Sequence, residues 1–380
     1  MRCSRVFLPR KRGSELMKAA IFHTAGAPLE IETITLGNPG HNEVLVEVAA
    51  TGLCHTDLHF MQGHLPLQAP AILGHETAGI VRAVGAGVSY MKPGDHVIGC
   101  LSAFCGCCHM CLSGNPSICE DQPAINRSEE EPPRLQQKDT KVQQFMNLSA
   151  FADHMLVHEH ALAKIDPAMP LDKAALIGCG VTTGVGAVMR TAQVEVGSSV
   201  VVIGCGAVGL NAIQGARLAG ALNIIAVDIN VGRLDMARNF GATHVINSSL
   251  DDAVDQVMQI TAGKGVEYAF EAVGHPDLAR NGFMMLRKNG LLVLIGLMSA
   301  DTEVSLPFHQ FIAQRKVMGC DMGSNRFRSD MQVMVQFYLD GRLNLDDMLT
   351  GRLPLSQIND GFAAMQRGEG LRTIIDFSMS

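Results

Sequence analysis

The pattern of hydrophobic and polar positions changes once along the chain. Between residues 18 and 99, short β-branched runs at residues 44–49 and 80–84 are separated by turn signals such as Pro39-Gly40 and Pro93-Gly94. This pattern predicts a compact, mostly β domain.

From about residue 181, apolar strands alternate with amphipathic helices, a pattern typical of a parallel sheet covered on both faces. The alternation fades past residue 321, and residues 327–380 are expected to form helices and one or two strands. The predicted strands are residues 200–203, 224–227, 268–270 and 291–295, and the predicted helices are residues 208–219 and 232–240. The sequence therefore predicts an α/β protein, with residues 17–180 and 322–380 in one domain and residues 181–321 in a doubly wound one.

Two segments are predicted to lie outside these domains. Residues 1–16 are basic, their apolar stretch is too short for a signal peptide, and we expect a disordered extension. Residues 128–144 contain three consecutive glutamates and two prolines, and we expect an exposed loop.

Composition narrows the class of protein. Hydrophobic residues make up 47% and charged residues 18%, which excludes a disordered chain. The net charge is −7, with no basic block beyond the N-terminus, so neither nucleic acid nor an anionic membrane is an expected partner. No apolar run reaches the roughly 18 residues of a spanning helix. Eleven cysteines without a secretory signal indicate free thiols in the reducing cytoplasm.

Four cysteines have the spacing of a closed metal site. They are Cys105, Cys108, Cys111 and Cys119. Four thiolates gathered in one lobe form the tetrahedral set of a structural zinc. Cys107 is off this spacing and is interpreted as a spectator.

Two earlier motifs, Cys54-His55 and Gly74-His75-Glu76, provide one more Cys and one more His. These are too few for a closed site, and a third ligand, Cys179, lies at the predicted junction of the two domains. Three protein ligands leave one zinc position open for water or substrate, as in a catalytic site. The sequence therefore predicts a second zinc in the cleft between the domains.

Acidic neighbours support the assignment of these ligands. An isolated Cys54 would be read as a buried thiol and an isolated His75 as a core histidine. However, Asp57 and Glu76 stand beside them, and zinc-bound histidine usually donates its second ring nitrogen to a carboxylate.

A dinucleotide-binding turn follows the strand at residues 198–203. The sequence Gly204-Cys205-Gly206-Ala207-Val208-Gly209 leads into a helix, and Asp228 ends the next strand. Glycines permit a tight turn that brings a pyrophosphate to the helix N-terminus. A carboxylate at Asp228 accepts the ribose hydroxyls of NAD and repels the 2′-phosphate of NADP, so NAD is the expected cofactor.

Together these motifs resemble the zinc-dependent alcohol dehydrogenases of the medium-chain dehydrogenase/reductase superfamily. The resemblance covers nearly all of residues 17–377, and its most specific motifs are residues 54–57, 74–76, the four-cysteine lobe and residues 178–184. It implies a GroES-like catalytic domain, a Rossmann domain, NAD and two zinc ions per chain, and a homo-oligomer, with a dimer favoured.

The resemblance also implies roles for individual residues. Thr56 and His59 match a proton relay, with Asp57 and Glu76 beside the zinc ligands. The expected NAD contacts outside the glycine turn are His55, Thr183, Arg233 and Arg372. The expected substrate pocket is formed by Leu101, Phe145, Met146 and Leu297.

The implied reaction is the reversible oxidation of a primary alcohol to its aldehyde. Zinc lowers the pKa of the alcohol, Thr56 and His59 carry its proton away, and the nicotinamide accepts a hydride. The apolar pocket suits an aliphatic or aromatic alcohol.

Three alternatives remain at this stage. In the glutathione-dependent formaldehyde dehydrogenases of the same family, an arginine follows the last structural cysteine, whereas this chain has Pro123 there and an offset Arg127. That branch also lacks a histidine at the position of His59. A non-catalytic, zinc-stapled nucleotide-binding protein would not need the relay, and a zinc-independent quinone reductase would not need seven zinc ligands.

Overall fold

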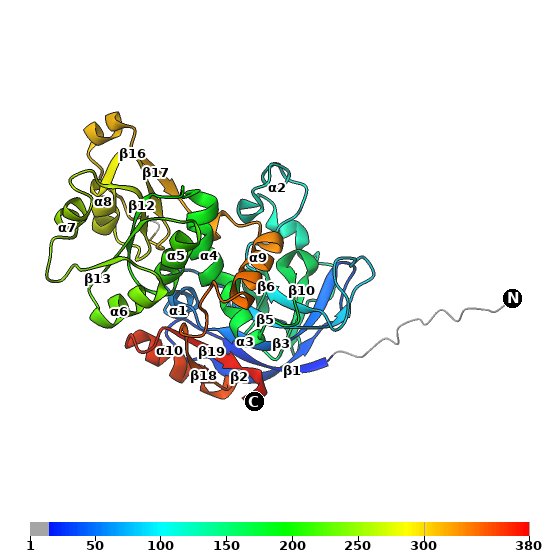
Figure 1. Cartoon of the computed structure of the whole chain (residues 1–380). Coiled ribbons are helices and arrows are strands. Elements are labelled where there is room, and N and C mark those ends of the chain that lie inside the picture. The colour runs from blue at the N-terminus through cyan, green and yellow to red at the C-terminus, as the bar shows by residue number, and fades with distance from the viewer. Residues whose placement is uncertain (1–14, 300, 380) are drawn as a thin grey trace.

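The computed structural model describes residues 15–299 and 301–379. Figure 1 shows a strand-rich part beside a part in which helices cover a parallel sheet. The first strand, β1, begins at Glu15 and therefore includes the last two residues of the expected N-terminal extension. The rest of that predicted extension, residues 1–14, lies outside the described residues.

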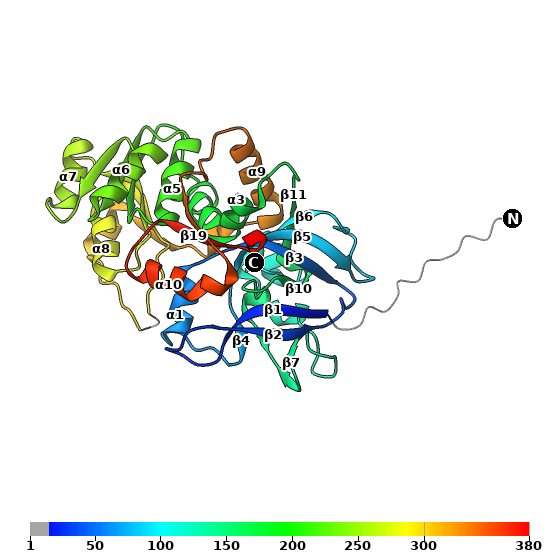
Figure 2. The same ribbon diagram turned by 90° about the horizontal axis from the view of Figure 1, so that it is seen from below.

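The strand-rich part contains two sheets (Figure 2). The first has the order β8-β7-β2-β1-β4-β9, and the second has the order β11-β6-β5-β3-β19-β18, with β10 also paired to β3. The strands are β1 (Glu15–Phe22), β2 (Glu30–Leu36), β3 (Glu43–Gly52), β4 (Ala71–Ile72), β5 (Glu76–Val84), β6 (His96–Gly99), β7 (Leu135–Gln137), β8 (Thr140–Lys141), β9 (Gln143–Gln144), β10 (His154–His158), β11 (Leu162–Ile165), β18 (Leu349–Leu353) and β19 (Arg372–Asp376).

The other part has one parallel sheet with the order β14-β13-β12-β15-β16-β17, which is the doubly wound order of a dinucleotide-binding fold. Its strands are β12 (Ser199–Ile203), β13 (Asn223–Asp228), β14 (His244–Asn247), β15 (Val266–Glu271), β16 (Leu286–Leu294) and β17 (Lys316–Gly319). The α-helices of the chain are α1 (His55–Met61), α2 (His109–Leu112), α3 (Leu171–Leu176), α4 (Thr182–Gly186), α5 (Ala207–Leu218), α6 (Val231–Phe240), α7 (Ala253–Ile260), α8 (Pro276–Met284), α9 (Phe327–Leu339) and α10 (Ile358–Gln366).

Burial explains the sequence pattern of the parallel sheet. Val200, Val201 and Val202 are consecutive in β12, and all three are fully buried. Helices cover both faces of this sheet, so the strand reads as a continuous apolar run rather than an alternating one. We propose the domain division expected from the sequence, because β17 is the last strand of the parallel sheet and β19 pairs with β3.

One continuous helical segment, Leu171–Thr191, connects the two parts. It consists of α3 and α4 and two π-helical turns, η5 (Ile177–Val181) and η6 (Ala187–Thr191). It is long and apolar enough to cross a membrane, with a mean hydropathy of 1.2, so the expectation that no segment reaches this threshold was wrong. However, 83% of its most apolar 18-residue stretch is buried inside the protein, which identifies the segment as a core helix.

The prediction of an exposed loop at residues 128–144 holds for residues 128–132, which are exposed and form no strand, and is wrong for residues 135–144. The segment forms β7, β8 and β9, and the side chains of Arg134, Leu135 and Val142 are buried. The polar composition of the segment did not predict these buried strands. Arg134 is buried because it forms an ion pair, which the local sequence does not reveal.

A buried carboxylate, Glu43, attaches this segment to the start of β3. Arg134 Nε donates to Glu43 Oε1 at 2.6 Å, and Arg127 Nε donates to the same oxygen at 2.9 Å. Burial alone would raise the pKa of Glu43, but the hydrogen bonds and charges of Arg127 and Arg134 lower it below its usual value. Two guanidinium groups therefore compensate for the burial of one carboxylate.

Glu43→Gln tests this ion cluster. We expect a loss of about 3 kcal/mol in the free energy of unfolding at pH 7, since two buried guanidinium groups lose their counter-charge. The lowered pKa means that the ionised carboxylate stabilises the fold above about pH 4.5, and that this contribution disappears as the pH falls through the lowered value. Denaturant unfolding should therefore show a difference between wild type and variant that shrinks in acid. Glu129→Gln, at an exposed glutamate, is the control, and equal stability of wild type and Glu43→Gln at pH 7 would contradict the interpretation.

Candidate functional site

Three elements bring the predicted ligands of the open zinc site together. Cys54 is the N-cap residue of α1, His75 immediately precedes β5, and Cys179 lies in the π-helical turn η5. The potential ligand atoms of these residues and of Glu76 all lie within 4.8 Å of one another. The sequence segments 54, 75–76 and 179 therefore form one cluster at the seam between the two parts of the chain.

The imidazole of His75 is oriented for a metal. Its Nδ1 lies 3.1 Å from Asp57 Oδ1, which also accepts a hydrogen bond from the backbone of Gly74 at 3.1 Å. Its Nε2 is buried and has no hydrogen-bond partner among the described residues. A carboxylate behind one ring nitrogen and a bare second nitrogen facing two thiols are what a zinc-bound histidine requires.

The thiols fit the same interpretation. A hydrogen bond from the Cys179 thiol lowers the pKa of Cys54 well below its usual value, and His75 and Arg372 act in the same direction. Burial alone would lower the pKa of His75, but the charges of Asp57 and Cys54 raise it well above its usual value. A buried group of thiolates and imidazole is the donor set that zinc prefers, so the residues fit the ion. Cys54 is 8% and Cys179 is 9% exposed, so the cluster is not sealed from solvent.

Glu76 lies close enough to this cluster to be a metal ligand itself, because its carboxylate is within 4.8 Å of the ligand atoms of Cys54, His75 and Cys179. Burial raises its pKa to about 8, although the charge of Arg372 opposes the shift. Its Oε1 lies 3.1 Å from Arg372 Nη2, but neither carboxylate oxygen has an aligned hydrogen bond. We interpret Arg372 as the ion-pair partner of Glu76. The carboxylate held in this pair leaves the fourth zinc position open.

Arg372 itself is nearly buried beneath the zinc cluster. Its Nη1 donates to the backbone oxygen of Leu53 at 2.9 Å, and a Cβ on Gly180 would meet its Nη2 at 2.6 Å. Only glycine at position 180 permits this approach. The structure therefore ties Arg372 to Glu76 and to the helix carrying Cys179, in addition to the expected pyrophosphate contact, which stays a prediction.

The π-helical turn that carries Cys179 has its own contacts. Thr182 Oγ1 donates to the backbone oxygen of Ile177, five residues back, at 2.6 Å. Such turns interrupt the regular register of a helix and often occur at functional sites. Met322, which sequence reasoning missed, has its sulfur 3.9 Å from Cys179 Sγ and 3.4 Å from Thr183 Oγ1. No motif in the sequence marks it, because thioether packing has no characteristic spacing.

The second cluster forms the predicted lobe around α2. The Sγ atoms of Cys105 and Cys111 are 3.9 Å apart, and those of Cys108 and Cys119 are 3.8 Å apart. Zinc–sulfur bonds of about 2.3 Å in a tetrahedron require sulfur–sulfur distances of about 3.8 Å. Backbone N–H groups of Cys107 and Cys108 donate to Cys105 Sγ and lower the pKa of that thiol to about 6. The lobe therefore fits a closed zinc site.

The glycine turn after β12 has the geometry of a pyrophosphate cradle. Gly204 has a φ of +94°, and a Cβ on Gly209 would meet the Gly204 oxygen at 1.8 Å. A Cβ on Gly206, by contrast, would meet no atom within 4 Å. The open space at Gly206 and the following N-terminus of α5 fit the close approach of a dinucleotide. Val208 lies in the first turn of α5.

Two carboxylates at strand ends hold neighbouring turns: Asp228 holds the glycine turn, and Glu271 holds the turn after β15. Asp228 Oδ2 accepts a hydrogen bond from the Cys205 backbone at 2.7 Å, and its Oδ1 accepts one from Asn230 at 2.9 Å. Glu271, which sequence reasoning missed, accepts hydrogen bonds from the backbones of Val273 and Gly274 at 2.9 and 2.8 Å. Glu271 is fully buried. The one sequence signal for it was an acidic residue at the end of a predicted strand.

The proposed relay residues share one face of α1. Thr56 and His59 are three residues apart, in the first and last turns of the helix, which is the spacing of neighbours on a helix surface. His55 is on the same helix, and burial lowers its pKa, with the charges of Arg372, His59 and Arg233 acting in the same direction. Arg233 lies in α6 of the dinucleotide-binding part, so α1 faces the seam (Figure 1).

The predicted pocket residues are not all brought together. Phe145 is buried, and its ring centroid lies 6.1 Å from that of His75. Met146 packs in the same hydrophobic cluster as Phe145, whereas Leu101 packs against other clusters. Leu297 is 60% exposed after β16. Phe145, through its ring contact with His75, and Leu101, which packs against the hydrophobic cluster that contains Cys54 and Cys179, are therefore the predicted pocket residues beside the zinc cluster.

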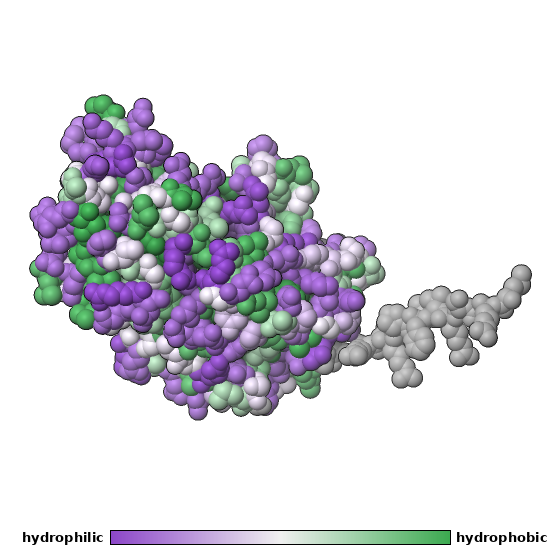
Figure 3. Space-filling model, in the orientation of Figure 1, coloured by the Kyte–Doolittle hydropathy of each residue, from purple (hydrophilic) through white to green (hydrophobic). Residues whose placement is uncertain are grey.

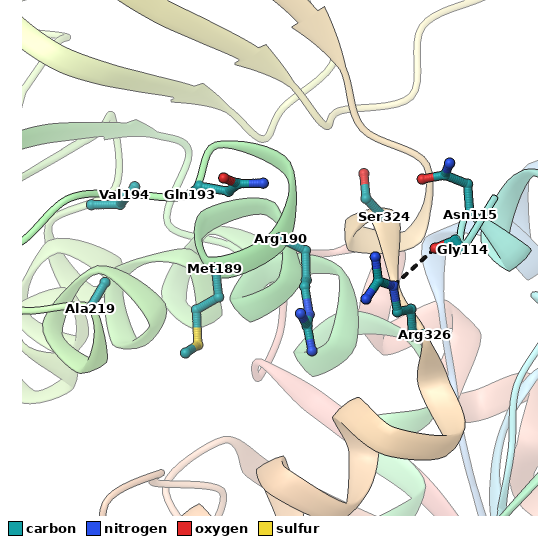
Figure 4. A pocket seen from close by; sticks show the side chains of 9 residues that line it. All are labelled: Gly114, Asn115, Met189, Arg190, Gln193, Val194, Ala219, Ser324 and Arg326. Carbon is teal, nitrogen blue, oxygen red and sulfur yellow. Dashed lines mark hydrogen bonds between the residues drawn. The ribbon is translucent and has the colours of Figure 1, made fainter.

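A separate cavity lies between the lobe and the core helix, as Figure 4 shows. It contains none of the predicted zinc or NAD residues. Its two arginines are already paired, because Arg326 donates to the Gly114 oxygen at 2.9 Å and Arg190 pairs with Asp330. We interpret it as a structural seam rather than a substrate site.

Comparison with known proteins agrees with this geometry. Residues 40–167 match the model of the alcohol dehydrogenase GroES-like domain, and residues 207–340 match that of the zinc-binding dehydrogenase. The chain is 39% identical over 370 residues to the S-(hydroxymethyl)glutathione dehydrogenase of Paracoccus denitrificans, covering 94% of this chain and 99% of the relative. It is also 39% identical over 376 residues to the alcohol dehydrogenase class-3 of Cereibacter sphaeroides, covering 95% and 99%.

Solved structures show the same fold. The benzyl alcohol dehydrogenase of Acinetobacter calcoaceticus superimposes with a TM-score of 0.90 at 33% identity, covering 95% of this chain and 99% of the other. An alcohol dehydrogenase zinc-binding domain protein from Burkholderia ambifaria gives a TM-score of 0.92 at 36% identity, covering 96% and 99%. The predicted family and fold class are confirmed, with zinc and NAD as cofactors. The chain belongs to the zinc-dependent alcohol dehydrogenases of the medium-chain dehydrogenase/reductase superfamily, which are NAD-dependent oxidoreductases.

Proposed function

We propose that the protein oxidises a primary alcohol, aliphatic or aromatic, to its aldehyde and catalyses the reverse reduction. The observation that carries this proposal is the buried cluster of Cys54, His75 and Cys179 with Phe145 beside it. An apolar ring next to an open metal position favours an uncharged carbon chain or ring.

The chain's own residues position the substrate and move its proton. When bound, zinc supplies a Lewis acid that lowers the pKa of the alcohol, and NAD supplies the hydride acceptor. Asp57 fixes the tautomer of His75 through Nδ1. Thr56 Oγ1 accepts the alcohol proton, and His59, one helical turn further along α1, receives it.

Oxidation of a thiol adduct of formaldehyde is the second candidate, favoured by the similarity to the S-(hydroxymethyl)glutathione dehydrogenase of Paracoccus denitrificans. An adduct with a charged carboxylate needs a free cation. Arg127 is engaged by Glu43, donates to the Pro132 and Asn38 oxygens, each at 2.7 Å, and has a side chain only 13% exposed. Pro123 offers no charge. These contacts favour the alcohol reaction.

A homo-oligomer, with a dimer favoured, is part of the proposal. Strand β17 lies at the edge of the parallel sheet. Beside it in sequence, the short helix η7 (Phe308–Ala313) exposes 80% of Phe308 and 76% of Ile312. Figure 3 shows hydrophobic surface, in green, at the upper left of the molecule, on the side of the parallel sheet. An open edge and exposed apolar side chains favour burial against a second copy. The described cysteines are free, which suits the cytoplasm.

The division of labour between the zinc sites is testable by substitution. The wild type should contain two zinc ions per chain. Cys119→Ser should lose one zinc and unfold at lower temperature, because binding of a structural zinc contributes folding free energy. Cys179→Ser should lose the other zinc and turnover but keep its circular dichroism spectrum.

Cys107→Ser is the matched control in the lobe and should keep both ions by elemental analysis. A wild type with one zinc, or a Cys107→Ser variant that loses zinc, would contradict the assignment.

The cofactor preference should depend on the charge of Asp228. Asp228→Asn keeps an acceptor for the turn and removes the charge that repels a 2′-phosphate. We expect the ratio of kcat/KM for NADP to that for NAD to rise about tenfold, which corresponds to about 1.4 kcal/mol. Asp277→Asn, at an exposed carboxylate on α8, should leave the ratio unchanged. A wild type that already prefers NADP would refute this role of Asp228.

A substrate panel decides between the two candidate reactions. We expect kcat/KM to be at least about tenfold higher for benzyl alcohol or hexanol than for formaldehyde with glutathione, a difference of about 1.4 kcal/mol. Arg127→Gln should lower stability without changing this ratio. Selective loss of thiol-adduct oxidation in Arg127→Gln, or a wild type that prefers the adduct, would establish the second candidate instead.

A further inference from the structure

The turn after α1 returns the chain toward the helix. Gly63 has a φ of +77°, and a Cβ there would lie 2.9 Å from the Ala25 Cβ, so glycine is required. The backbone N–H of His64 then donates to the His59 oxygen at 3.0 Å. This geometry places the side chain of His64 beside that of His59, five residues earlier.

The two imidazole rings form a hydrogen-bonded pair. Nδ1 of His59 lies 3.2 Å from Nδ1 of His64, with ring centroids 5.5 Å apart and planes tilted by 43°. One ring must donate its Nδ1–H while the other accepts, because each neutral imidazole carries a single N–H. Neither Nε2 has a hydrogen-bond partner within residues 15–299 and 301–379.

Exposure differs between the partners. His59 is half-buried, on the face of α1 that also carries Thr56, whereas His64 is exposed. His64 is therefore the ring of the pair that lies closer to bulk water. His55, on the same helix, interacts electrostatically with His59, with Arg233 from α6 and with Arg372 from β19.

We propose that His64 is the outermost member of the proton relay, an inference that rests on the proposed role of Thr56 and His59. A proton arriving at His59 Nε2 releases the Nδ1 proton of His59 across the 3.2 Å contact to His64 Nδ1. His64 then releases its Nε2 proton to water, so one proton enters and one leaves. Only N–H bonds form and break. Both rings end in the opposite tautomer, and each recovers its starting tautomer by proton exchange with water before the next turnover. In aldehyde reduction the same protons travel inward.

Kinetics of the NAD- and zinc-loaded enzyme test whether His59 and His64 act one after the other in a single proton pathway. His64→Gln should lower kcat/KM for the alcohol about threefold to tenfold below pH 7, at the lower end of general-base effects because water partly replaces an exposed group. Added imidazole should restore activity. The double variant His59→Gln/His64→Gln should be no slower than His59→Gln alone, since members of one pathway are not additive. His244→Gln, an exposed histidine on β14, is the control.

A spectroscopic readout tests whether the two rings are hydrogen-bonded in solution, and the kinetics then separate a relay from a structural contact. In enzyme with ¹⁵N-labelled histidine, His59→Gln should shift the Nδ1 resonance of His64, because its hydrogen bond is lost. An unchanged His64→Gln pH–rate profile beside a slow His59→Gln would overturn the role of His64 and leave the inner relay intact. Additive losses in the double variant would also overturn it. No loss in His59→Gln itself would instead refute the proposed relay from Thr56 onward.

Discussion

The rest of the structure depends on one buried cluster of two thiols and one imidazole. Cys54, His75 and Cys179 come from a helix cap, a strand start and a π-helical turn. A bare His75 Nε2 buried without a partner would be costly unless it faces a ligand. A zinc ion removes this cost, and it can do so only when all three segments are in place. The seam between the domains is therefore set by the chemistry of the metal.

The dinucleotide turn and the zinc cluster share their supports. The helix that carries Cys179 continues into α4, where a Cβ on Gly184 would meet the Val208 oxygen at 2.4 Å, so α4 packs directly on the dinucleotide-binding helix α5. Arg372 joins the zinc cluster to the end of β3 through Leu53. These contacts fix the zinc ligands relative to the dinucleotide-binding helix, and the same contacts would orient a bound cofactor and substrate for hydride transfer.

The sequence predicted what depends on spacing and missed what depends on folding. The glycine turn and the cysteine lobe have fixed separations along the chain, so the sequence placed them in the right elements. The strand pairs at residues 128–144 were missed because Arg134 is buried by an ion pair with Glu43, 91 residues away. Met322 and Glu271 were missed for a related reason, since their contacts with Cys179 and with the turn after β15 form only in three dimensions. The sequence predicted Glu76 only as a neighbour of His75. It did not predict that the Glu76 carboxylate lies within reach of the same metal position as the three ligands.

The central claim is that one zinc is held by three side chains and keeps an open position, while the other is closed by four thiolates. Anomalous diffraction at the zinc absorption edge, on crystals of the NAD complex, tests it most directly. The account predicts two anomalous peaks per chain, one within about 2.0–2.3 Å of Cys54 Sγ, His75 Nε2 and Cys179 Sγ, and one centred in the lobe. It also predicts that Glu76 remains paired with Arg372. A single peak, or a zinc at the seam with Glu76 as a permanent fourth ligand, would contradict the account.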